Sequence, residues 1–91
     1  METNFYYVYV LQSGKDNEFY TGFTHDLRKR FRHHRAGAVP STRDRRPLTL
    51  VYYEACRDQH DAIRREKYLK SAWGKRFLKS RMIHYLTGFT P

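Results

Sequence analysis

The sequence predicts a small α+β fold in which a three-stranded, mainly antiparallel sheet is flanked by helices. The chain of 91 residues has the length of one domain, which we expect to span residues 1–91. Apolar residues make up 40% of it and aromatic residues 16%, enough to form a core and to exclude a disordered basic tail. Segments that favour strands and helices follow in the order ββαβαα, which is typical of α+β domains.

The first two segments form a predicted hairpin. Residues 5–11 are aromatic or apolar at both alternating sets of positions, which predicts a strand covered on both faces. Residues 13–17 have the composition of a hairpin loop. Residues 18–24 are then expected to return as the second strand, in which Gly22 permits a close backbone approach.

A helix follows the hairpin. Thr24 or Asp26 can cap its start, and Leu27, Phe31 and His34 recur at helical spacing on one face. Gly37 suits its C-terminal end. Residues 38–47 contain two prolines and four charged side chains, and this composition predicts a loop.

The second half of the chain predicts one strand and two helices. Residues 48–54 form the third strand, and Asp58 then caps a helix that runs to about Trp73, with Gly74 as its stop. A last helix is expected from about Lys75 to Leu86. We expect Trp73 to lie in the core.

Positive charge is concentrated in two blocks. Residues 25–46 hold eight Lys or Arg against two Asp, residues 64–81 hold eight against one Glu, and the chain as a whole carries a formal charge of +9. Basic blocks separated by acidic stretches favour a face that binds a polyanion, and nucleic acid is the expected partner. The alternative is a merely soluble basic protein, for example one associated with the ribosome.

Other classes are excluded by composition. No apolar run approaches the roughly 20 residues that a membrane-spanning helix needs. The one cysteine, Cys56, can form neither an internal disulfide nor a cysteine-rich zinc site. Because no secretory signal is visible either, we expect a cytoplasmic protein that does not associate with membranes.

Glu66 breaks the pattern of its helix. Ala62, Leu69 and Trp73 form an apolar stripe at helical spacing, and Glu66 lies on that stripe. A carboxylate on a face that meets the core is costly unless it is paired or holds a metal. An ion pair with Lys70, four residues further along, is the alternative to a metal site.

Four segments in this order resemble motifs of the GIY-YIG nuclease family. They are Tyr-Val-Tyr at 7–9, Tyr-Thr-Gly at 20–22, the basic segment 27–34 with Arg30 and His34, and residues 63–70 around Glu66. The likeness covers residues 6–80 or so and is greatest to small, stand-alone bacterial members. Tyr7 stands where many members have glycine, and Phe23 where some have lysine.

The resemblance implies an endonuclease that hydrolyses DNA phosphodiester bonds, in repair or processing, with one Mg²⁺ or Mn²⁺ ion. Glu66 is then the metal ligand, which is chemically reasonable because these hard cations accept a single carboxylate and retain waters. Arg30 would hold the scissile phosphate. Tyr9 would orient or deprotonate the attacking water, and Tyr20 would hydrogen-bond the phosphate or the nucleophile. His34 would shuttle a proton or contact the nucleic-acid backbone.

Nucleic-acid contacts, with DNA favoured over RNA, are expected from residues around these five. They are Gly22, whose missing side chain would admit substrate, and Arg28, Lys29, Arg32, Arg43, Arg45, Lys70 and Lys75. The alternative is that Tyr9 and Tyr20 are ordinary core rings and the chain is a catalytically silent nucleic-acid-binding module. Because 91 residues leave little room for a separate recognition domain, we expect weak activity alone or a protein partner that supplies specificity.

Overall fold

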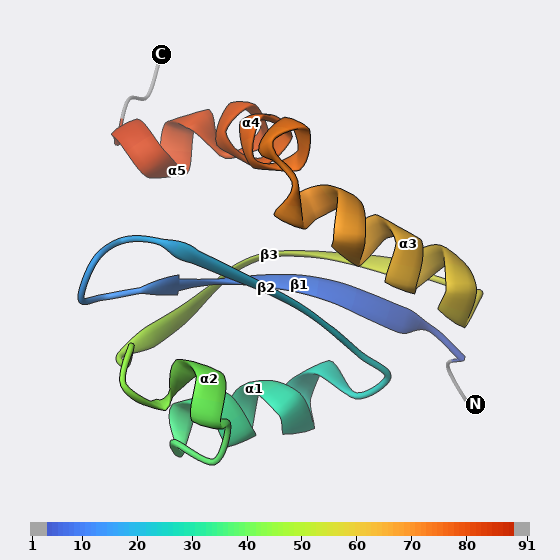
Figure 1. Cartoon of the computed structure of the whole chain (residues 1–91), viewed down its shortest axis with the longest axis horizontal. Coiled ribbons are helices and arrows are strands. Elements are labelled where there is room, and N and C mark those ends of the chain that lie inside the picture. Colours follow the sequence, from blue (N-terminus) through green and yellow to red (C-terminus); the bar gives the residue numbers. More distant parts are fainter. Residues whose placement is uncertain (1–3, 89–91) are drawn as a thin grey trace.

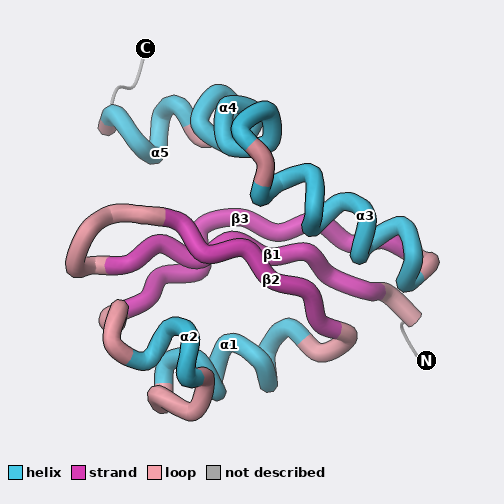
Figure 2. Tube along the Cα trace, viewed as in Figure 1, coloured by secondary structure: helices cyan, strands magenta, loops and turns pink. Residues whose placement is uncertain are grey.

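The sheet lies between two layers of helices, as the computed structural model of residues 4–88 shows (Figure 1). Its strand order is β2-β1-β3, and both neighbouring pairs are antiparallel, which confirms the predicted α+β class. One helical layer consists of α1 and α2, and the other of α3, α4 and α5 (Figure 2). The elements are β1 (Tyr6–Ser13), β2 (Phe19–Thr24), α1 (Leu27–Arg35), α2 (Pro40–Arg43), β3 (Leu48–Cys56), α3 (Gln59–Lys70), α4 (Ala72–Arg81) and α5 (Ile83–Thr87).

The central strand β1 is covered on both faces, as its composition predicts. Successive side chains of a strand point to opposite faces, so Val8 and Val10 pack on the α3 side with Ala62, Leu69 and Leu78. Tyr9 and Leu11 face the other way and pack with Leu48 and the half-buried residues of α1 and β2. Tyr9 therefore belongs to the layer that holds α1.

The long helix predicted up to Trp73 ends earlier, at Lys70. Ser71 then caps α4, because its hydroxyl oxygen accepts a hydrogen bond from the Gly74 N–H at 3.2 Å. Gly74 lies in the first turn of α4 and does not stop a helix. It is buried because this turn packs against the last turn of α3, where a Cβ at Gly74 would overlap the carbonyl of Tyr68 and the Cα of Leu69.

The change of direction at Ser71 also corrects the expectation for Trp73. Its side chain is 68% exposed and does not join the core. The guanidinium of Arg76 lies 4.8 Å from the centroid of the indole ring, so one face of the ring has a cationic neighbour.

Two further predictions on secondary structure were wrong. The predicted loop 38–47 contains the short helix α2, whose first residue is Pro40, a residue preorganised for the first position of a helix. The predicted last helix is divided at Met82, whose backbone departs from helical geometry, into α4 and α5. Within residues 4–88, no helix is long and apolar enough to cross a membrane.

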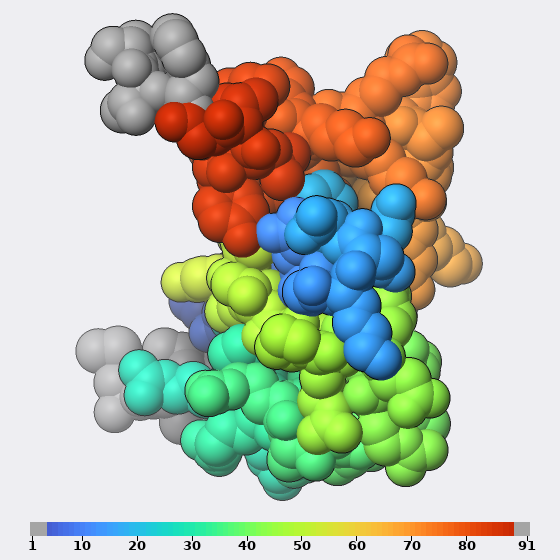
Figure 3. All heavy atoms as spheres, turned by 90° about the vertical axis from the view of Figure 1, so that its left-hand side faces the viewer, coloured from blue at the N-terminus to red at the C-terminus, as the bar shows by residue number. Residues whose placement is uncertain are grey.

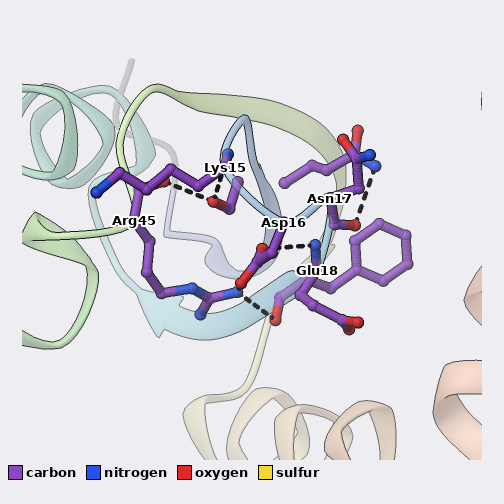
Figure 4. A network of polar contacts seen from close by, with 8 residues as sticks. Lys15, Asp16, Asn17, Glu18 and Arg45 are labelled. Atoms are coloured by element: carbon purple, nitrogen blue, oxygen red, sulfur yellow. Dashed lines mark hydrogen bonds and ion pairs between the residues drawn. The ribbon is translucent and has the colours of Figure 1, made fainter.

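The connection from α2 to β3 is fastened to the turn between β1 and β2. The Ser13 hydroxyl donates to the Arg45 carbonyl at 2.6 Å, and the Gly14 N–H donates to the Pro47 carbonyl at 2.7 Å. The Arg45 guanidinium reaches the carbonyl of Phe19 at 3.4 Å and lies 4.0 Å from the Asp16 carboxylate (Figure 4). Seen from this end, the β1–β2 turn lies between the two helical layers (Figure 3).

Replacing Gly74 with alanine is expected to destabilise the protein. Alanine is the better helix former by about 1 kcal/mol, but the added methyl group would meet backbone atoms of α3 that cannot move independently. Such overpacking typically costs 1–3 kcal/mol, and a contact with backbone belongs at the upper end of this range. After the gain in helix propensity of about 1 kcal/mol is subtracted, we expect a net loss of about 2 kcal/mol in the free energy of unfolding. Urea denaturation followed by far-UV circular dichroism measures it. Ser80→Ala, at an exposed position of the same helix, should change it by less than about 0.5 kcal/mol; equal effects of the two variants would contradict the packing argument.

Candidate active site

Tyr9 and Gly22 face each other directly across β1 and β2. The Tyr9 ring lies so close to Gly22 that a Cβ at this position would overlap the ring and its hydroxyl group. Gly22 is itself buried. The Tyr9 ring therefore makes the close approach expected at Gly22. It occupies the space that was predicted to admit substrate.

The Tyr9 hydroxyl group meets two side chains of α1. His34 Nε2 lies 2.8 Å from Tyr9 Oη, and Arg30 Nε donates to the same oxygen at 3.4 Å. His34 and Arg30 are one helical turn apart, so they share the face of α1 that meets the sheet. Asp26, one of the two predicted caps, fixes the start of this helix by accepting from the Lys29 N–H.

The buried pair Tyr9–His34 is electrically neutral. Both side chains are almost inaccessible, at 1% and 0% exposure. Burial raises the pKa of Tyr9 above its ordinary value, and the hydrogen bond from Arg30 acts in the opposite direction. Burial, together with the positive charge of Arg30 and then that of His33, lowers the pKa of His34 to about 4. At neutral pH Tyr9 thus keeps its proton and His34 lacks a second one.

Tyr20 completes a group of rings around His34. The centroid of its ring is 5.3 Å from that of His34, and the Tyr9 ring is 5.6 Å away on the same imidazole. The Ser41 hydroxyl donates to Tyr20 Oη at 3.5 Å. The structure therefore brings Tyr9, Tyr20, Arg30 and His34 together at one place between α1 and the sheet.

Glu66 approaches this group from α3. Its side chain is 20% exposed, and its negative charge is near enough to add to the raised pKa of Tyr9. Lys70 Nζ lies 3.1 Å from Glu66 Oε2, so the ion pair considered in the sequence analysis is present. Lys70 is itself 54% exposed, which places this contact at the surface of the molecule.

The donor set around Glu66 fits a cation that keeps most of its waters. Within residues 4–88, no three His, Cys, Asp or Glu side chains gather as a metal cluster. A site that offers a single carboxylate does not suit zinc but suits Mg²⁺ or Mn²⁺, which bind through one or two carboxylates and retain waters. A cation at Glu66 would share the carboxylate with Lys70 or displace it.

Apart from Arg45, the basic residues predicted to contact nucleic acid lie on three parts of the surface. Arg28, Lys29 and Arg32 are exposed on α1. Lys70 and Lys75 line a depression of about 230 Å³ together with Tyr20, beside the candidate site. Arg45 differs from the others because its guanidinium is used inside the chain, in the contacts with Phe19 and Asp16 described above.

Arg43 belongs to a larger basic groove of about 880 Å³. This groove lies at the β3 edge of the sheet, with Phe31, Leu48 and Leu50 among its apolar residues. Its positively charged residues are Lys15, Arg35, Arg43 and Arg46, against one acidic residue, Asp44. Arg46 is held in place by the carbonyl groups of Arg43 and Arg35, at 2.9 and 3.5 Å.

Thr42 and Ser41 extend the site and were not predicted from the sequence. Thr42 is fully buried, and its Oγ1 lies 2.7 Å from His34 Nδ1. Both residues lie on α2, inside the segment predicted to be a loop. Pro40 directly before them, as a residue typical of a helix start, is the signal that could have indicated this helix.

Sequence comparisons match this chain to a family model and to bacterial proteins. The family model of the GIY-YIG catalytic domain matches residues 5–80. The UPF0213 protein YazA of Bacillus subtilis is 38% identical over 77 residues, which cover 84% of this chain and 77% of that protein. A UPF0213 protein of Lacticaseibacillus paracasei is 42% identical over 71 residues, 77% of this chain and 79% of its own length.

A solved structure matches the fold. It is the solution NMR structure of the UPF0213 protein BH0048 from Bacillus halodurans, with a TM-score of 0.54, 37% identity, and coverage of 84% of this chain and 83% of that one. Its identity and coverage agree with those of the sequence relatives. With the family model spanning most of the chain, these likenesses show that the protein belongs to the GIY-YIG family.

Proposed function

We propose that this protein is a divalent-metal-dependent endonuclease that hydrolyses phosphodiester bonds in nucleic acid, with DNA as the favoured substrate. The observation that carries the proposal is the contact of the Tyr9 hydroxyl group with a neutral, buried histidine and a positively charged arginine. The match to a family model of a catalytic domain supports the same class of activity.

In the proposed reaction, Tyr9 and His34 act together as the base. An attacking water gives a proton to Tyr9 Oη while Tyr9 gives its own proton to His34 Nε2, across the 2.8 Å contact. The water oxygen forms the new bond to phosphorus. The bond from phosphorus to the leaving oxygen breaks, and this oxygen departs with the electron pair and takes a proton from solvent. Tyr9 does not have to exist as a phenolate, which its raised pKa disfavours.

Arg30 couples substrate binding to this base. A guanidinium can hold a phosphodiester through two parallel hydrogen bonds and stabilise the charge that develops on its oxygens. The positive charge of Arg30 is also one reason why the pKa of His34 is low. A bound phosphate would offset that charge, so substrate binding itself should make His34 a better proton acceptor.

Glu66 would hold the metal ion. When bound there, a divalent cation supplies charge stabilisation for the phosphate and the leaving oxygen. The proposal requires that Lys70 can leave the carboxylate, which its exposed position allows.

The silent nucleic-acid-binding module remains the second candidate. The observation that favours it is the Glu66–Lys70 ion pair, since it gives the glutamate a partner without any metal. Exposed pairs of this kind contribute little to stability, about 0.3–0.5 kcal/mol for residues four apart on a helix. The two candidates differ in whether the carboxylate is needed for cleavage.

Glu66→Gln is expected to abolish metal-dependent cleavage while salt-sensitive binding of DNA persists. The amide keeps the shape of the side chain but lacks the negative charge that holds a hard cation. Cleavage of a labelled oligonucleotide set and of plasmid DNA, with Mg²⁺, Mn²⁺ or EDTA, measures the effect. Glu18→Gln, at an exposed position in the β1–β2 connection, is the matched control and should cleave as the wild type does. Wild type without cleavage under all conditions, or equal cleavage by wild type and Glu66→Gln, would contradict the proposal.

Neutralising the basic groove should weaken nucleic-acid binding more than an equal change of charge elsewhere. For the double variant Arg35→Gln, Arg43→Gln, we expect the slope of log affinity against log salt to fall in magnitude by about 1.4–1.8, since each lost phosphate contact removes about 0.7–0.9. Fluorescence anisotropy at several salt concentrations measures this slope. The control double variant Lys67→Gln, Lys79→Gln changes two exposed residues of α3 and α4; an equal loss in the control would show that only net charge matters.

Because His34 is buried, the stability of the protein should decrease as the pH is lowered. In the unfolded chain this histidine takes up a proton near its ordinary pKa of 6.5, whereas in the folded protein it does so only near 4. Between pH 6.5 and 4 the unfolded state therefore binds more protons, and the free energy of unfolding should decrease by up to about 3 kcal/mol from this group. Denaturation at several pH values should show a smaller decrease in His34→Gln than in wild type. His25→Gln, at an exposed position, should retain the wild-type pH dependence.

A further inference from the structure

We propose that Thr42 is a positioning residue that fixes the tautomer of His34, so that Nε2 is free to accept the proton of Tyr9. The inference rests on the proposed function for its use in catalysis, but the tautomer itself is a property of the free protein. It also assigns a purpose to α2, the short helix that carries Thr42.

The geometry leaves each nitrogen of the imidazole with one partner. Nδ1 lies 2.7 Å from Thr42 Oγ1 and Nε2 lies 2.8 Å from Tyr9 Oη. His34 and Thr42 both have 0% exposure, so water does not compete for these contacts. A neutral imidazole carries one proton, and therefore one of its nitrogens donates and the other accepts.

The hydrogen bond from Arg30 determines which imidazole nitrogen of His34 accepts a hydrogen bond from Tyr9. A guanidinium can only donate, so Tyr9 Oη accepts the hydrogen bond from Arg30 Nε. The proton of Tyr9 then needs an acceptor, and among residues 4–88 the atom placed to receive it is His34 Nε2. The imidazole proton must consequently be on Nδ1, where Thr42 Oγ1 accepts it. A threonine in a helix can give its own hydroxyl proton to a carbonyl of the preceding turn, which leaves its oxygen available for this role.

The position of α2 is fixed from both sides. Val39, directly before the helix, is buried, and the Thr42 N–H donates to the Val39 carbonyl at 3.1 Å. After the helix, the Ser13 hydroxyl holds the Arg45 carbonyl, and the Arg45 guanidinium holds the other end of the β1–β2 turn (Figure 4). Thr42 is therefore presented to His34 by a segment that is anchored to the sheet.

The same helix contacts the second tyrosine. Ser41, the neighbour of Thr42, donates to Tyr20 Oη. Two adjacent hydroxyl groups of α2 thus meet His34 and Tyr20, the rings that pack on each other at 5.3 Å. With Thr42 in place, proton transfer from Tyr9 to His34 gives an imidazolium whose Nδ1–H remains hydrogen-bonded, and no buried N–H loses its partner during the reaction.

Nitrogen-15 NMR of the imidazole tests the inference directly. At pH 7.5, in the free wild-type protein, we expect the Nδ1–H tautomer of His34 to predominate at least tenfold, its signals being assigned by their loss in His34→Gln. Thr42→Val removes the acceptor with little change in volume and should raise the Nε2–H form to at least one third of the population. Thr42→Ser retains the hydroxyl group and should keep the wild-type tautomer.

The possible results are decisive in either direction. A wild-type protein in the Nε2–H form overturns the inference without any variant, so the test holds even if Thr42→Val fails to fold. An unchanged tautomer in folded Thr42→Val overturns it as well. Expected cleavage kinetics are a 10- to 100-fold lower kcat for Thr42→Val with KM changed less than threefold, and recovery to within threefold of wild type in Thr42→Ser.

The two proposals fail separately. If wild type shows the Nδ1–H tautomer and Thr42→Val shifts it, but no variant and no condition gives cleavage, the positioning role stands and the nuclease does not. If cleavage depends on Glu66 but the tautomer of His34 is unchanged in Thr42→Val, the nuclease proposal stands and the positioning role does not.

Discussion

The contact between the Tyr9 ring and Gly22 determines the arrangement of the whole site. Because the two residues face each other across β1 and β2, the ring can lie over the neighbouring strand only where that strand has no side chain. This geometry directs the hydroxyl group toward α1. A buried hydroxyl group needs a hydrogen-bond partner, and α1 supplies His34 and Arg30 from a single face. The packing of this one ring therefore places its hydroxyl group against α1, where the contacts with His34 and Arg30 form the centre of the candidate site.

Burial gives this site an unusual distribution of charge. Tyr9 and His34 are both kept neutral by the same lack of solvent, because burial shifts their pKa values in opposite directions. The permanent charges belong to Arg30, Glu66 and Lys70, which are all more accessible than the neutral pair. In the proposed reaction, the proton transfer from Tyr9 to His34 would start from two uncharged groups, and a phosphate and a cation would meet opposite charges at Arg30 and Glu66. The division between a neutral interior and a charged margin suits a reaction on an anionic substrate.

The sequence allowed the sheet and most of the site to be predicted, since both depend on periodicity and on motifs in a fixed order. The alternation in β1 placed Tyr9, and the helical spacing of Leu27, Phe31 and His34 placed the histidine on the buried face. Thr42 was missed because a helix of four residues is too short for any periodic pattern. Trp73 was misplaced because the apolar stripe was continued through Ser71, where the chain starts a new helix in another direction. Glycine is common at the ends of helices, which is why Gly74 was predicted to stop one. Its role is instead to allow the close approach of α3 and α4, and this contact does not show in the sequence.

The exposed indole has a practical consequence for spectroscopy. The chain has one tryptophan, and this side chain already stands largely in water in the native state. Its emission maximum should move little when the protein unfolds, so a fluorescence melt would show only a small change in signal even in a fully folded sample. The guanidinium next to the ring makes its emission sensitive instead to whatever polyanion attracts Arg76 away from it. Tryptophan fluorescence in this protein therefore reports on the surface of α4 and not on the integrity of the core.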